Sequence, residues 1–173
     1  MGLDSVELLM EFENFFEIEV PDDEATKMRT IADAVTYISN HIEFTDHAIN
    51  IKEEIFKDLA NAFSKFNISI SQTDLVFETL SIIEEQTWIE ISKITDFEIP
   101  LSFSVSKIDK LFNKIFPNNI SYDGLDFKRY TNLIGAINYQ RLISKGNVKN
   151  EYEVMIAVMG ITIEKIGVSP FEV

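Results

Sequence analysis

Few residues of this chain are of types that carry out covalent chemistry. Cysteine is absent, so disulfides, thiolate metal sites and a cysteine nucleophile are excluded. His41 and His47 lie six residues apart in a polar stretch, and we expect them to be surface residues, not metal ligands. The sequence shows no nucleophile–base–acid pattern and no glycine-rich phosphate loop, so we expect neither an enzyme nor a metal centre.

Asp4 and Ser5 stand at the start of the first predicted helix, residues 5–17. Their short oxygen-bearing side chains can cap a helix, because they accept hydrogen bonds from unpaired amides of the first turn. The helix has a broad apolar arc, and its solvent-facing side carries Glu7, Glu11 and Glu17. These acids form either a plain solvated helix face or a docking surface for basic proteins.

Charge is spread unevenly along the 173 residues, which hold 29 acids and 15 bases for a net charge of −14. Residues 1–48 hold 12 acids and 2 bases, a net charge of −10. Such a segment repels phosphate backbones, so we expect no nucleic-acid partner. It would instead attract basic protein surfaces.

The spacing of apolar residues predicts an all-α fold, with small antiparallel bundles whose core includes many of the 14 phenylalanines. Pro21 can open a short helix, and Thr30 is expected to cap the next. The predicted helices after Thr30 span residues 31–42, 51–66, 71–94, 104–116, 125–143 and 151–166. For residues 88–91 a strand is the alternative to a helix, and Pro100 ends that region. The helix over residues 125–143 is expected to be weakest at Gly135. Residues 43–50 read as a linker, and residues 144–147 read as a turn or linker.

The sequence contains no feature of a membrane or secreted protein. No apolar run approaches the roughly 18 residues needed to span a bilayer. A basic-then-apolar N-terminal signal is not visible. We therefore expect a cytoplasmic location.

Three N-terminal motifs occur together at close spacing. Residues 1–5 read MGLDS, residues 18–25 read IEVPDDEA, and residues 27–38 read KMRTIADAVTYI. They resemble the Leu-Gly-x-Asp-Ser signature, the loop into helix III, and the Thr-(Ile/Val)-x-x-Ala-(Ile/Val)-x-Tyr-Ile ending of acyl carrier proteins. Residues 1–43 therefore look like helices II to IV of a carrier domain, with helix II about one turn shorter after the serine.

The far end of the chain resembles the helix that this segment lacks. Residues 152–173 read YEVMIAVMGITIEKIGVSPFEV, which is similar to helix I of the same family, including its Gly-Val-x-Pro-x-x-Val exit. We expect residues 151–173 to provide helix I. Three arrangements remain open: a permuted domain, a homodimer that exchanges helix I, and a chain boundary between tandem domains.

The resemblance implies a function and a set of site residues. Ser5 would carry a 4'-phosphopantetheine arm, whose thiol holds acyl groups as thioesters for fatty-acid, polyketide or related lipid synthesis. Asp4 matches the aspartate that helps bind the metal used by phosphopantetheinyl transferase. Candidate walls of an acyl pocket are Val6, Leu9, Met10, Phe12, Phe16 and Ile38. Candidate contacts for acyl-processing enzymes with basic docking surfaces are Glu7, Glu11, Glu17, Asp22, Asp23 and Glu24.

These site residues also have simpler structural explanations. Ser5 could be only a helix cap, and the apolar stripe could be ordinary core. The acids at residues 22–24 lack the spaced ligands and the glycine of a calcium loop. The alternative function is an unmodified pseudo-carrier that acts as a protein–protein adaptor.

The middle of the chain, residues 51–143, is expected to form a second helical domain. Residues 120–139 echo residues 20–37, which indicates a degenerate carrier-like repeat. Its nearest counterpart of Ser5 is Ser104, but Phe103 replaces the aspartate. We therefore expect the second domain to be unmodified.

Overall fold

A computed structural model describes residues 3–44, 50–80, 83–99 and 124–166. Within these ranges the regular structure is helical and no strand is formed, so the predicted all-α class is confirmed. The helices are α1 (Leu3–Phe16), α2 (Asp22–Ala25), α3 (Ile31–His41), α4 (Ile51–Ser64), α5 (Val76–Leu80), α6 (Glu85–Thr95), α8 (Phe127–Ile137), α9 (Tyr139–Leu142) and α10 (Glu151–Ile166). In these parts of the chain no helix is both long and apolar enough to span a bilayer.

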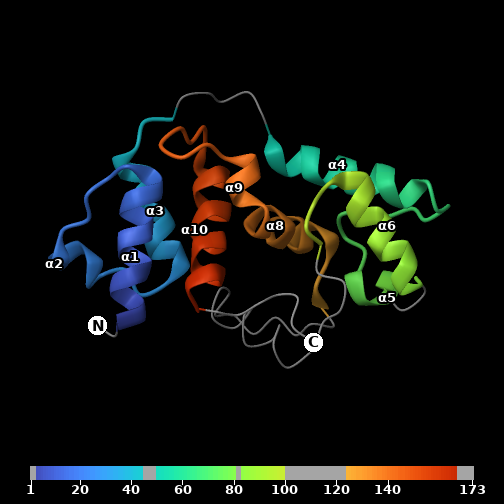
Figure 1. Cartoon of the computed structure of the whole chain (residues 1–173), viewed down its shortest axis with the longest axis horizontal. Helices are drawn as coiled ribbons and strands as arrows, with labels where there is room; N and C mark the ends of the chain where they lie inside the picture. Colours follow the sequence, from blue (N-terminus) through green and yellow to red (C-terminus); the bar gives the residue numbers. More distant parts are fainter. Residues whose placement is uncertain (1–2, 45–49, 81–82, 100–123, 167–173) are drawn as a thin grey trace.

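The helices are spread along the longest axis of the molecule, with α10 near the middle (Figure 1). On one side, α10 contacts α1 and α3; on the other, it contacts α8 and α9. Beyond them, α8 packs against α4, and α4 packs against α6. The last described helix therefore lies between the first helices and the middle region.

The sequence of α10 explains its central place. Its residues are apolar on nearly every side, and the run from Glu153 to Ile163 is buried apart from the partly exposed Met155. A helix that is apolar all round is stable only when neighbours cover it on several sides. A single cluster of buried side chains accordingly extends from Phe12 in α1 through α10 to Trp88 in α6.

The tightest approach to α10 occurs at Gly160. A β-carbon at this position would overlap the ring of Tyr139 and the carbonyl oxygen of Ala136. The junction of α8 and α9 can therefore press directly against the backbone of α10. A second glycine, Gly135 in α8, faces Ile156 of α10 and Ile55 of α4.

The end of α1 is tied to the turn that precedes α10. Glu17 adopts a left-handed conformation (φ 56°), and the amide of Ile18 donates to the carbonyl of Glu13 at 3.2 Å, as in a Schellman cap. The amide of Gly146, which also has a positive φ (66°), donates to the carbonyl of Phe15 at 3.0 Å. This bond fixes the predicted turn at residues 144–147 beside α1, so α1 and α10 run antiparallel.

The start of α3 confirms the predicted cap. The hydroxyl of Thr30 accepts from the amide of Asp33 at 3.1 Å, and the carboxylate of Asp33 accepts from the amide of Thr30 at 2.9 Å. These bonds satisfy two amides that a helix start otherwise leaves unpaired. They also lower the pKa of Asp33, chiefly through the hydrogen bond with Thr30.

The prediction of one helix over residues 71–94 is wrong. The hydroxyl of Ser71 donates to the carboxylate of Asp74 at 2.6 Å and closes a turn, a local bond that competes with helix formation. Two helices, α5 and α6, follow in place of one. The alternative of a strand at residues 88–91 is also wrong, because Trp88 and Ile91 are buried together at helical spacing.

A second difference lies in the predicted helix over residues 125–143. Gly135 is inside α8, and the break falls at Asn138, between α8 and α9. The predicted helix at residues 104–116, Ser104 and Pro100 lie outside the described residues, as do His47 and the exit at residues 167–173.

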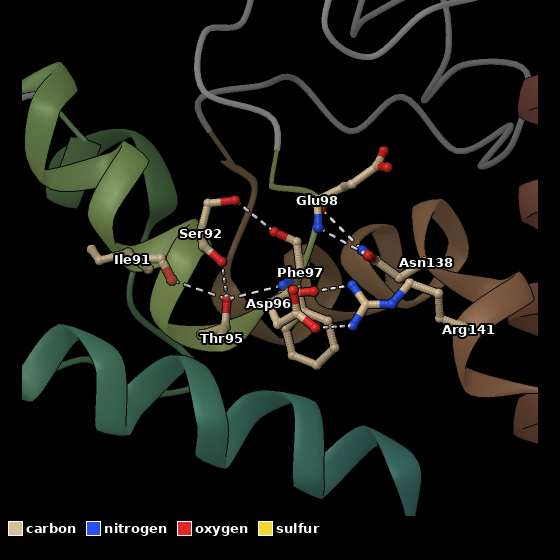
Figure 2. A network of polar contacts seen from close by, with 8 residues as sticks. All are labelled: Ile91, Ser92, Thr95, Asp96, Phe97, Glu98, Asn138 and Arg141. Atoms are coloured by element: carbon tan, nitrogen blue, oxygen red, sulfur yellow. Dashed lines mark hydrogen bonds and ion pairs between the residues drawn. The ribbon is translucent and has the colours of Figure 1, made fainter.

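Asn138 ends α8 because its side chain binds a neighbouring segment (Figure 2). The buried amide accepts from the amide of Glu98 at 2.9 Å and donates to the carbonyl of Glu98 at 2.9 Å. It also donates to the carbonyl of Ile134 at 2.8 Å. Nearby, Arg141 forms an ion pair with Asp96 at 2.6 Å and also donates to its carbonyl. The α8–α9 junction thus holds the segment that follows α6.

Gly160→Ala is expected to destabilise the protein by about 2 kcal/mol or more, measured by urea unfolding. The added methyl group forces α8 and α9 away from α10, and overpacking of this kind typically costs about 1–3 kcal/mol. Gly124→Ala is the control, since no atom of the described residues lies within 4 Å of its added carbon. Equal stability of the Gly160 variant and the wild type would contradict the close approach.

Asn138→Ala is expected to destabilise the protein by about 1–3 kcal/mol, because two backbone groups of Glu98 lose their partner. Arg141→Met serves as the comparison within the same network. It removes an exposed ion pair, which contributes about 1 kcal/mol at most. Thermal unfolding of both variants checks the order, and a larger loss for Arg141→Met would refute it.

Candidate functional site

The first candidate site residues lie at the start of α1. The helix begins at Leu3, so Asp4 and Ser5 belong to its first turn and neither is the residue before the helix. The prediction that one of them caps the helix from outside is therefore wrong, because the helix already includes both. The side chains of both lie outside the described residues. Their backbone position still places Ser5 where a 14-residue helix has unpaired amides and the positive end of its dipole.

A cavity of about 280 Å³ opens between α1, α3, α10 and the connection from α2 to α3. It is lined by Leu8, Phe12, Met28, Arg29, Thr30, Ile31, Ala34, Val158 and Thr162. Most of these side chains are apolar, and the hydroxyl of Thr162 is already bonded to the carbonyl of Val158 at 2.6 Å. The walls therefore suit an apolar group, with Arg29 and Thr30 as the polar part of the lining.

Helical spacing relates Ser5 to this cavity. Leu8 and Phe12, the two cavity residues of α1, follow Ser5 by three and seven positions. Positions i, i+3 and i+7 share one stripe of a helix. The position of Ser5 thus lies one turn before the cavity wall on the same stripe. A flexible chain attached at this position would have a short path to the cavity.

The predicted pocket residues are dispersed. Among the six, Phe12 alone lines the cavity, while Phe16 and Ile38 are buried core residues. Leu9 is half-buried, whereas Val6 and Met10 are 44% and 60% exposed. The other cavity residues were not singled out as pocket walls. Five of them lie in the connection to α3 and in α10, whose approach to α1 only the tertiary fold determines.

The predicted docking acids occupy two places. Glu7 is exposed on α1, Glu17 is exposed directly after its end, and Glu11 forms an ion pair with Lys165 of α10 at 2.8 Å. The acids of α2 form its first turn: Asp22 and Asp23 are exposed, and Glu24 pairs with Lys27 at 2.6 Å. The contact of Lys165 with Glu11 was missed from the sequence, because 154 residues separate them.

The acids of the described residues do not form a metal site. No group of three or more His, Cys, Asp or Glu side chains in these parts of the chain could hold an ion. Comparison with known proteins adds no assignment: no protein-family model and no solved structure matches the chain. The cavity and the acidic helix beside it are thus the features from which a function is argued.

Ala34→Leu is expected to close the cavity. Ala34 lines it from α3, and the larger side chain would occupy its volume. Titration with 1-octanol, followed by NMR at the methyl groups of Leu8, Ile31 and Val158, should give shifts in the wild type that weaken about tenfold in the variant. Ala32→Leu makes the same change at an exposed position of α3 and should leave them intact. Equal shifts in both variants would place the alcohol elsewhere.

Proposed function

We propose that this chain is an acyl carrier protein, modified with 4'-phosphopantetheine at Ser5. The observation that carries the proposal is the stripe from Ser5 to Leu8 and Phe12, which leads into an apolar cavity. The sequence resemblance supports it, since the cavity lies among the segments that resemble helices I, II and IV. α10, which resembles helix I, packs against α1 and α3 of the same chain, so exchange between two copies is not required.

The residues at hand fit the phosphopantetheine group. A phosphodiester at Ser5 would lie in the first turn of α1, where free amides and the helix dipole favour an anion. The arm, when bound, supplies the thiol that this cysteine-free chain lacks. Asp4 is the matching position for the transferase metal. Leu8, Phe12 and Val158 would shield a bound acyl chain from water, and the acids of α1 would orient basic partner enzymes.

A different class of function remains a second candidate. The helices α4, α6 and α8 form a substantial part of the buried core, yet none of them lines the cavity. An adaptor that uses this half to bind other proteins would need no arm at Ser5. We place it second, because no described residue of that half lines the cavity beside α1.

Loading of Ser5 is the test. Intact mass is measured before and after incubation with coenzyme A, magnesium and a broad-specificity phosphopantetheinyl transferase. We expect a gain of one phosphopantetheine unit, abolished in Ser5→Ala and retained in Ser69→Ala, which alters an exposed serine between α4 and α5. Unfolding curves of both variants are measured to check that each variant keeps the fold. A wild-type chain that stays unmodified beside a fully converted control carrier would favour the adaptor.

A further inference from the structure

Two lysines from other parts of the chain contact the acidic face of α1. Glu7, Glu11 and Asn14 follow one another at helical spacing on one face of α1. The ammonium of Lys165, at the end of α10, lies 2.8 Å from a carboxylate oxygen of Glu11. The ammonium of Lys145, in the turn before α10, donates to the side-chain oxygen of Asn14 at 2.7 Å. Two lysines therefore lie along this face, one near each end of α10.

The charges act as one network. The hydrogen bond from Lys165 lowers the pKa of Glu11, and the charge of Lys145 adds to this effect. Conversely, the hydrogen bond to Glu11 raises the pKa of Lys165, with a further contribution from the charge of Glu7. Both lysines thus interact with the same short section of α1.

Both partners of the Glu11–Lys165 pair remain accessible to an outside molecule. The side chains of Glu11 and Lys165 are 39% and 32% exposed. Exposed ion pairs of this kind add little to stability, so the pair is not needed to hold α10 in place. The burial of α10 between α3 and α8 already does so. A basic side chain of another protein could replace Lys165 without disturbing the core.

We propose that Lys145 and Lys165 mask the acidic face of α1 and compete with basic protein surfaces that dock there. The lysines occupy the positions that a partner's lysines or arginines would take, and docking displaces them. The identification of that partner as an acyl-processing enzyme rests on the proposed function; the masking itself does not. The contacts of Lys145 and Lys165 with α1 lower the association rate of a basic partner, because charges at the rim of an interface act mainly on association.

The test compares two double variants of equal net charge. Lys145→Met with Lys165→Met removes the masking lysines, and Lys57→Met with Lys93→Met removes two exposed lysines of α4 and α6. The probe is a fluorescently labelled decalysine peptide, whose binding is followed by anisotropy at low ionic strength. We expect the masking variant to bind about threefold or more tightly than the control variant. Adding Glu11→Gln to the masking variant should remove most of that gain.

The outcomes separate the masking from the proposed function. Equal binding by the two double variants overturns the masking, because the gain would then reflect net charge alone. A gain that survives Glu11→Gln also overturns it. Loading of Ser5 by the transferase is measured on the same proteins and reports on the carrier function alone. Tighter peptide binding without loading upholds the masked face and refutes the carrier.

Discussion

The packing of α10 is the interaction on which the other contacts depend. This helix is buried between α3 on one side and α8 on the other, and Gly160 allows the α8–α9 junction to touch its backbone. Each fully buried Val, Ile or Met side chain contributes roughly 1.5–3 kcal/mol, and α10 buries several. Because α10 (Glu151–Ile166) is far from α1 and α3 in the sequence, its contacts with them join residues more than a hundred positions apart. Contacts of such separation form slowly, so the core is expected to be completed late in folding.

Along the seam between α1 and α10, electrostatic contacts contribute less to stability than burial does. An exposed pair such as Glu11–Lys165 contributes much less to stability than the buried side chains of α10. The seam is therefore held by burial and by the backbone bond from Gly146 to Phe15. Since the lysines are not required for stability, their charges are free to serve recognition. This division of roles explains how an acidic helix can be both firmly packed and open to exchange of its ionic partners.

The sequence predicted local structure well and long-range arrangement poorly. The Thr30 cap, the turn at residues 144–147 and the extent of α10 follow from residues close together in the chain, and the structure confirms them. One error was local, since the bond from Ser71 to Asp74 replaces the predicted start of a helix. The other errors arose where distant segments intervene. Asn138 breaks a predicted helix because it binds Glu98, forty positions away, and most of the cavity wall comes from segments that only folding brings to α1. Exposure of Val6 and Met10 could not be read from an apolar stripe, since periodicity gives a face but not its neighbour.

The central position of α10 also gives the remaining half of the chain a role in the proposed carrier site. Val158 and Thr162 form one wall of the cavity, and Gly160, between them in sequence, is pressed against Ala136 and Tyr139. Densely packed interiors transmit displacements, so a shift at the α8–α9 junction would move that wall. The same junction is tied through Asn138 and Arg141 to the segment after α6. The width of the cavity therefore depends on both halves of the molecule, although the segments that resemble carrier helices I to IV, at the two ends of the chain, include neither α8 nor α6.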